Sequence, residues 1–171
     1  MELARIIALA VAGTAAIIDV RTRRIPNLLT FGSAIVALGY HTVQDGFPGL
    51  GRGAAGWAVG IALFLPMFLL RGMGAGDVKL LGAVGSWLGP VGALWSGFLS
   101  VLAGGVLALI VGASRGYLRQ AFRNLWGLFG FWRVAGIRPQ PGLTVEDAPG
   151  PRLAYGVAIA AGTIAAVLLN K

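Results

Sequence analysis

The sequence predicts an all-α integral membrane protein with about six membrane-spanning helices and one amphipathic helix at the cytoplasmic membrane surface. Hydrophobic residues make up 57% of the 171 residues and charged residues only 12%, whereas ordinary soluble domains carry about 25% charged residues. The basic residues fall in short clusters between apolar runs, which is the topological pattern of a membrane protein and not the continuous basic face of a nucleic-acid-binding protein. The length favours a single domain over residues 1–171.

The apolar runs can be assigned to spans in chain order, because a helical span needs about 17–25 mostly apolar residues. Pro26 disfavours helix at Ile25, residues 44–53 are rich in Gly and Pro and predict a turn, and Gly89-Pro90 ends the fourth run. The predicted spans are Leu3–Ile18, Leu28 to about Val43, Ala54–Leu70, Val78 to about Leu88, Val91 to about Ala113, and Leu153–Leu169.

The orientation follows from the basic residues. The first run is short and Ala-rich and could be a secretory signal peptide. Its basic cluster of Arg21, Arg23 and Arg24 follows the run instead of preceding it, which favours an uncleaved span with the N-terminus outside. Eleven of the 14 Lys and Arg residues then lie on the cytoplasmic side. The same orientation puts Asp19 and Asp77 together at the cytoplasmic boundary.

The segment between the fifth and sixth spans, about residues 114–151, has a different pattern. Apolar residues recur at helical steps over 118–132, and Arg115, Arg119 and Arg123 flank them. This pattern predicts a helix in the cytoplasmic interface with its arginines toward anionic headgroups. A loop helix packed on the bundle is the alternative.

Two carboxylates lie at the ends of apolar runs, Asp19 after the first and Asp77 before the fourth. An ionisable group at membrane depth points to function. Taken singly, Asp19 could be an ion partner of nearby arginines and Asp77 an acid at a helix entry. If they share a site, repulsion between like charges favours a pair that holds one proton. Such a pair can activate water against a peptide carbonyl and protonate the leaving amine.

Gly72, Gly74 and Gly76 precede Asp77. They allow positive φ angles and close approach of a helix or a peptide, so we expect them to contribute to a substrate site. The spacing matches neither a phosphate-binding loop nor a dinucleotide site. With one histidine and no cysteine in the chain, no metal site and no cofactor are predicted. His41 is interpreted as a boundary residue without a role.

Three segments resemble the type IV prepilin peptidases. Gly74–Asp77 resembles the Gly-x-Gly-Asp motif of membrane aspartic proteases, and the following Val-Lys-Leu-Leu continues it as in this family. Asp19–Asn27 resembles the region around the family's first catalytic aspartate. Leu153–Ile159 resembles the Pro-Tyr-Gly-Pro-Ala-Ile pattern of its last span, with Ala154 and Val157 in place of both prolines.

The resemblance implies a multi-pass enzyme of the inner (cytoplasmic) membrane that removes short basic leaders from prepilins and pseudopilins. It implies that Asp19 and Asp77 are catalytic and that Tyr155 and Gly156 belong to the substrate site. Larger members carry a cysteine-containing cytoplasmic insert after the first span and also methylate the new N-terminus. This chain has no such insert there, so it resembles the short peptidase-only branch, such as members that serve Flp/Tad-type pili.

Two alternatives stay open at this point. The Gly-x-Gly-Asp motif is shared with presenilin-like intramembrane proteases, although the context of Asp19 fits prepilin peptidases better. Paired acids could also bind and release protons in a proton-coupled transporter without hydrolysis.

Overall fold

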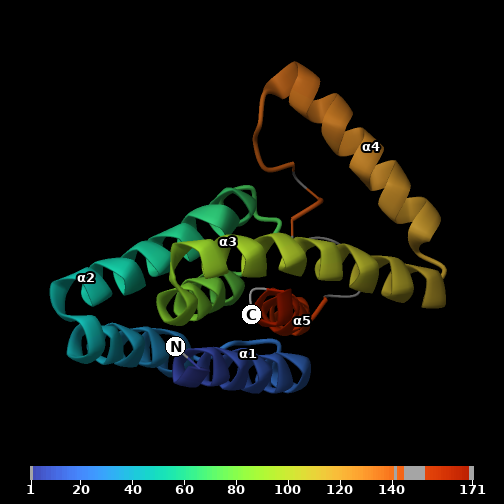
Figure 1. The fold of residues 1–171 in the computed structure, drawn as a ribbon. Helices are drawn as coiled ribbons and strands as arrows, with labels where there is room; N and C mark the ends of the chain where they lie inside the picture. Colours follow the sequence, from blue (N-terminus) through green and yellow to red (C-terminus); the bar gives the residue numbers. More distant parts are fainter. Residues whose placement is uncertain (1, 141, 145–152, 170–171) are drawn as a thin grey trace.

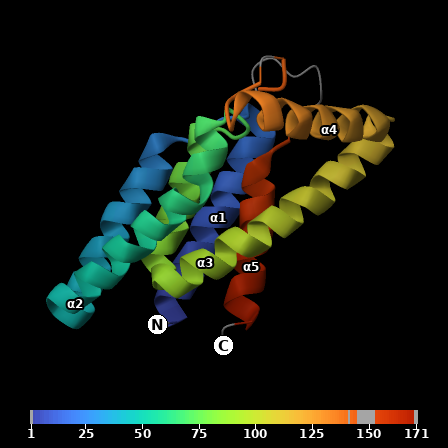
Figure 2. The same cartoon turned by 90° about the horizontal axis from the view of Figure 1, so that it is seen from above.

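The computed structural model describes residues 2–140, 142–144 and 153–169, and within these residues the chain is helical with no strand. The helices are α1 (Glu2–Thr22), α2 (Asn27–Leu69), α3 (Ala75–Ser114), α4 (Leu118–Ala135) and α5 (Tyr155–Leu169). Figures 1 and 2 show a bundle of α1, α2, α3 and α5, with α4 set apart and lying across one end. The all-helical prediction is confirmed.

The two longest helices are each bent at a glycine. Gly46 in α2 has φ 65° and ψ −146°, and Gly89 in α3 has φ 76° and ψ 179°, angles that side chains make costly. Pro48 and Pro90 lie just after the bends, in the first turn of the next helical segment, where a missing N–H breaks no helical hydrogen bond. The chain turns back at each bend, so that each helix consists of two segments running in opposite directions (Figure 2).

The predicted spans can be compared with these helices. Among the described residues, α1, α2 and α3 are long and apolar enough to cross a membrane, and α5 is a shorter apolar helix. The predicted turn over residues 44–53 is too wide, because only Gly46 leaves the helical conformation and the other glycines and the proline lie within the helix. The six predicted spans correspond to α1, the two segments each of α2 and α3, and α5; the number of membrane crossings stays a prediction.

The first segment of α3, residues 75–88, lies at the centre of the bundle. Every residue from Leu80 to Trp87 is buried, and α3 contacts α1, α2 and α5. A helix that is apolar on all sides has to be surrounded by other helices. This segment was the shortest of the predicted spans, and it is the one on which the other helices pack.

Helix backbones approach closely where the second segment of α2 crosses the first segment of α3. A Cβ atom added at Gly56 would lie 2.0 Å from the carbonyl oxygen of Gly85, and one at Gly60 would lie 2.4 Å from that of Leu81. Small residues of this kind allow close van der Waals packing between helices in a membrane. The central position of α3 therefore requires glycine at these positions.

Gly56→Ala should destabilise the bundle by about 1–3 kcal/mol, because the new methyl group must push two backbones apart. Unfolding of the purified protein in detergent, by heat or by SDS, measures the change. Gly51→Ala is the matched control, because Gly51 lies in the same segment of α2 and a Cβ atom there meets nothing within 4 Å. Equal stability of the two variants would contradict the close contact.

Candidate active site

Asp19 lies near the end of α1 and is only 7% exposed. The helix ends just after it because Arg23 takes a left-handed conformation (φ 55°) and donates its N–H to the Asp19 carbonyl oxygen at 2.9 Å, a common way to terminate a helix. The Asp19 side chain accepts a hydrogen bond at Oδ2 from the Gly156 N–H, at 2.9 Å. This N–H belongs to the first turn of α5, where backbone donors have no partner within the helix. A charge-assisted hydrogen bond therefore joins α1 to α5.

Gly156 leaves room for this contact. A Cβ atom added there would lie 3.1 Å from both Cβ and Oδ2 of Asp19 and 3.4 Å from Cα of Ala16. A side chain at this position would have to move either the carboxylate or the start of α5. The structure thus places Gly156 next to Asp19, in contact with the carboxylate itself, and its predicted part in the substrate site stays a prediction.

Tyr155 anchors the start of α5 on its other side. Its ring packs edge-on against Phe64, with centroids 5.8 Å apart, and its hydroxyl donates to the Ser100 carbonyl oxygen at 3.4 Å. Gly104 makes room for the ring, because a Cβ atom there would lie 2.6 Å from it. The Tyr155 side chain also lies within electrostatic range of Asp77.

Asp77 lies in the first turn of α3 and is half-buried. The helix begins after Gly74, whose φ of −75° and ψ of 148° are those of a helix cap. The Asp77 N–H donates to the Gly74 carbonyl oxygen at 3.2 Å, and the Gly74 backbone hydrogen-bonds the Asp77 carboxylate in return. The bond to the carboxylate is the half of a capping box that the third helical residue supplies, since Gly74 has no side chain to supply the other half. Asp77 is thus a helix-entry acid that stabilises the start of α3.

The same carboxylate also faces a second acid. Asp77 and Asp19 interact electrostatically, although they come from helices remote in sequence. The end of α1, the start of α3 and the start of α5 meet at one end of the bundle (Figure 2). The structure therefore brings four of the predicted site residues together, the two aspartates with Tyr155 and Gly156; their roles in catalysis stay predictions.

The loop between α2 and α3 differs from its prediction in one respect. None of its glycines takes a positive φ; the left-handed residue is Arg71, with φ 55°. The Arg71 N–H donates to the Phe68 carbonyl oxygen and the Gly72 N–H to that of Met67, each at 2.9 Å. These bonds form a Schellman motif in which arginine occupies the position that glycine usually takes.

The loop glycines act through their small size. A Cβ atom added at Gly76 would lie 3.2 Å from Cβ of Ile25, in the loop after α1, and one at Gly74 would lie 3.2 Å from Oδ2 of Asp77. At Gly72 the nearest atom would be 3.5 Å away, an ordinary contact. Gly74 and Gly76 therefore let the start of α3 approach its neighbours closely, and contact with a substrate stays a prediction.

Lys79 ties the start of α3 to the start of α2. Its Nζ donates to Oδ1 of Asn27 at 3.0 Å and lies 5.3 Å from the centre of the Phe31 ring. Both contacts are favourable for an ammonium group. This contact could not be predicted from the sequence, because Lys79 and Asn27 are 52 positions apart and no repeating pattern relates the two positions.

A cavity of about 430 Å³ is lined by Val20 and Val157, the residues that directly follow Asp19 and Gly156 in the chain; neither aspartate lines it. It lies between the end of α1, the second segment of α3 and the residues that lead into α5. Its lining is mostly apolar with two arginines, and consists of Val20, Arg23, Leu107, Val111, Arg115, Leu153, Ala154 and Val157. Ala154 and Val157, which stand where the resembled pattern has prolines, therefore face this opening.

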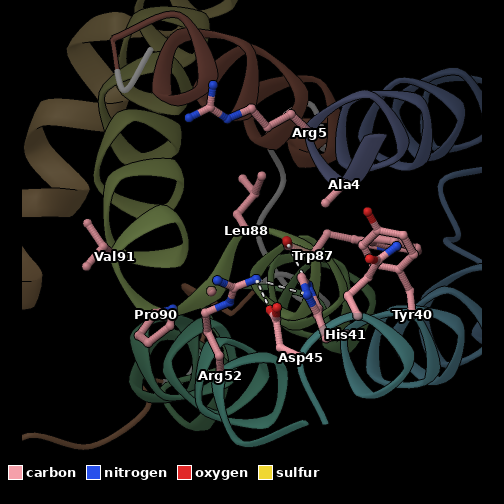
Figure 3. A pocket seen from close by; sticks show the side chains of 12 residues that line it. Ala4, Arg5, Tyr40, His41, Asp45, Arg52, Trp87, Leu88, Pro90 and Val91 are labelled. Atoms are coloured by element: carbon pink, nitrogen blue, oxygen red, sulfur yellow. Dashed lines mark hydrogen bonds and ion pairs between the residues drawn. The ribbon is translucent and has the colours of Figure 1, made fainter. Parts of the chain in front are cut away.

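A second polar cluster, formed by His41, Asp45 and Arg52, lies near the bends of α2 and α3 (Figure 3). These bends are at the other end of the bundle (Figure 2). His41 is 3% exposed, and its Nε2 donates to the Trp87 carbonyl oxygen at 3.1 Å. Arg52 donates to the other ring nitrogen at 3.2 Å and pairs with Asp45 at 3.4 Å. These groups border a cavity of about 360 Å³. His41 lies near the end of the first segment of α2, as its interpretation as a boundary residue requires, but it is not without a role, because it is buried and bridges α2 to α3 just before the bend at Gly89.

Comparison with known proteins gives a family. A model of the type IV leader peptidase family matches residues 6–109. The chain belongs to this family. No curated protein and no solved structure matches the chain. The matched part of this leader peptidase family member includes both aspartates and the glycine loop, whereas Tyr155 and Gly156 lie outside it.

At this site, the described side chains that can take part in chemistry include the carboxylates of Asp19 and Asp77 and the hydroxyl of Tyr155. Among the described residues, no cluster of three His, Cys, Asp or Glu side chains could hold a metal ion. The chain has no cysteine, and its histidine lies in the second polar cluster. Chemistry by the two carboxylates stays a prediction for this site.

Gly156→Val should destabilise the protein by about 1–3 kcal/mol, because its methyl groups have to enter the space next to Asp19, where a Cβ atom alone would already lie 3.1 Å from the side chain. Thermal unfolding in detergent measures the effect. Gly13→Val in α1 is the matched control, since a Cβ atom there meets nothing within 4 Å. If the two variants unfold at the same temperature, α5 does not approach Asp19 in the way described.

Proposed function

We propose that the protein is a peptidase-only aspartic endopeptidase that removes the leader peptide from prepilin-like substrates of the Flp/Tad type at the cytoplasmic membrane face. The observation that carries the proposal is that Asp19, at the end of α1, and Asp77, in the first turn of α3, lie at the same end of the bundle and within electrostatic range of each other. Membership of a family of leader peptidases favours peptide hydrolysis over proton transport.

Two carboxylates that share one proton can perform both halves of peptide hydrolysis. The ionised carboxylate takes a proton from water as the water oxygen attacks the scissile carbonyl carbon. The protonated carboxylate donates a hydrogen bond to the carbonyl oxygen, and a proton passes to the leaving amine nitrogen when the C–N bond breaks. Either aspartate can fill either role, because the proton belongs to the pair.

Backbone groups hold both carboxylates in position. The Gly156 N–H binds Asp19 and the Gly74 backbone binds Asp77. Backbone donors orient a carboxylate without neutralising its charge, and they are fixed by the helices to which they belong. This arrangement supports a preorganised site, as catalysis requires.

The cavity lined by Val20 and Val157 is the opening that we assign to the substrate. Its apolar walls suit a peptide that reaches the site from the bilayer, and Arg23 and Arg115 line it. These arginines repel a basic leader, and such repulsion can select one binding direction over the other. We therefore place the leader away from this cavity and the rest of the substrate chain within it.

The proposal includes six membrane crossings, with the N-terminus outside and the aspartates on the cytoplasmic side. Arg21, Arg23 and Arg24 follow Asp19, and Arg71 lies in the loop before Asp77. This concentration of positive charge at the aspartate end agrees with the positive-inside rule.

Asp19→Asn and Asp77→Asn should each lower the rate of leader removal by at least about 100-fold, because each removes a group that must carry a proton. The assay mixes purified enzyme with candidate prepilins and identifies the new N-terminus by mass spectrometry.

Asp45→Asn serves as the control for charge, since Asp45 lies in the second polar cluster and its exposed ion pair with Arg52 contributes little to stability. It should cleave at the rate of the unmodified enzyme. Cleavage by either of the other variants at a near-normal rate would leave the substituted aspartate with a structural role only and would rule out the two-aspartate mechanism. Solute-driven proton transport without any cleavage would favour the transporter instead.

Cysteines placed at positions 19 and 77 should join, because the two aspartates share one site. The chain has no cysteine of its own, so each pair can be tested alone. A disulfide requires Cα atoms within about 7 Å, and bifunctional thiol reagents of graded length extend the range. Gel mobility after cleavage of the chain between the two positions reports the cross-link.

A pair at positions 19 and 45 is the control and should not join with short reagents, because Asp45 lies in the second polar cluster. Failure of the 19–77 pair with every reagent, with and without prepilin, would falsify the shared site and with it the proteolytic mechanism.

A further inference from the structure

The helix α4 carries an apolar surface that the bundle does not cover. Among the described helices it contacts α3 alone, and none of its residues is buried. Phe122, Leu125, Trp126 and Phe129 are 61%, 50%, 82% and 53% exposed. Their spacing of three and four residues puts them on one face of the helix. We call these four residues the apolar face.

The other side of α4 is directed toward the chain itself. Asn124, Leu128 and Phe131 are half-buried there. Trp132 donates from Nε1 to the carbonyl oxygen of Arg138 at 2.9 Å, in the segment that follows the helix. The helix therefore has a covered side and an uncovered side, and the uncovered side bears the large aromatic residues. An exposed apolar patch of this kind marks a binding surface.

The charged residues of α4 are all positive. Arg119 and Arg123 are exposed on one flank of the apolar face, Arg133 is exposed in line with the face at its C-terminal end, and α4 contains no Asp or Glu. Aromatic and aliphatic side chains beside arginines fit the surface of an anionic bilayer, where the rings enter the boundary of the acyl chains and the guanidinium groups meet phosphates. The acidic residues of a soluble protein could pair with the arginines, but its polar surface would not bury the apolar face.

The orientation of α4 agrees with a membrane surface. It crosses the directions of α1 and α5 at the end where α1 finishes and α5 begins (Figure 2). In the membrane arrangement proposed above, the bundle helices run through the bilayer and α4 lies along the plane of its surface, at the end that holds the aspartates.

We propose that α4 binds anionic phospholipid on the aspartate side of the membrane, with the apolar face at the acyl boundary and its three arginines on headgroup phosphates. The inference rests on the membrane arrangement of the proposed function and not on its peptidase chemistry. α4 follows closely after Arg115, which lines the same cavity as Val20 and Val157. Lipid bound to α4 therefore holds one wall of that cavity.

Nitroxide labels at single cysteines can test this in the full-length protein. Phe129→Cys places a label in the apolar face, and Gly127→Cys is the matched control two positions away, where a Cβ atom meets nothing within 4 Å. The protein is reconstituted in phosphatidylcholine vesicles with or without phosphatidylglycerol. Electron paramagnetic resonance then compares access of a water-soluble nickel reagent to the two labels. In anionic vesicles the 129 label should be protected and the 127 label open.

Replacing Arg119, Arg123 and Arg133 by Gln should remove the difference between anionic and neutral vesicles. Each arginine near an anionic surface changes the ratio of bound to free helix by roughly fivefold, which corresponds to about 1 kcal/mol. Equal nickel access at 129 and 127 in anionic vesicles would overturn the proposal. Protection at 129 that appears only when a protein partner is added would overturn it in favour of that partner. The labels report without any cleavage, so this test can fail while leader removal persists.

Discussion

The burial of the first segment of α3 is the constraint on which the other helices depend. Because this segment is apolar on all sides, it has to be surrounded, and α1, α2 and α5 supply its surroundings. The glycines at its crossing with α2 bring backbones into direct contact, which fixes the distance between the helices. Asp77 begins the segment and Gly89 ends it. The positions of both polar clusters therefore follow from the placement of one buried helix.

At the aspartate end, two carboxylates lie beside two helix N-termini. Asp77 lies in the first turn of α3, and Asp19 accepts a hydrogen bond from the first turn of α5. The N-terminus of a helix carries partial positive charge and unpaired N–H groups. The convergence of α3 and α5 thus gives each of the two carboxylates a backbone hydrogen-bond donor within an apolar bundle. Lys79 is directed to Asn27, where it joins α3 to α2.

Features that depend on local sequence could be predicted, and those that depend on distant partners could not. The bend at Gly89-Pro90, the helix over α4 and the positions of both aspartates at helix ends each follow from a local pattern. The pattern also overstated the α2 turn, since the prolines and glycines around Gly46 are compatible with helix once the bend has been made. Two sets of contacts could not be predicted, because they join segments that no sequence pattern relates. These are the hydrogen bonds of His41 to Trp87 and Arg52 and the hydrogen bond of Gly156 to Asp19. Only the folded structure shows them.

Arg23 and Arg71 both adopt left-handed backbone conformations at the ends of α1 and α2. Glycine would fill these positions with less strain, since the left-handed region costs other L-residues roughly 1–2 kcal/mol. A cation next to a helix C-terminus recovers about 0.3–1 kcal/mol of that difference. In the proposed orientation both arginines also belong to the charge that keeps this end in the cytoplasm. With arginine in place of glycine, the residues that end these two helices also help to set the orientation of the protein in the bilayer, and the left-handed conformation lowers the stability of the fold slightly.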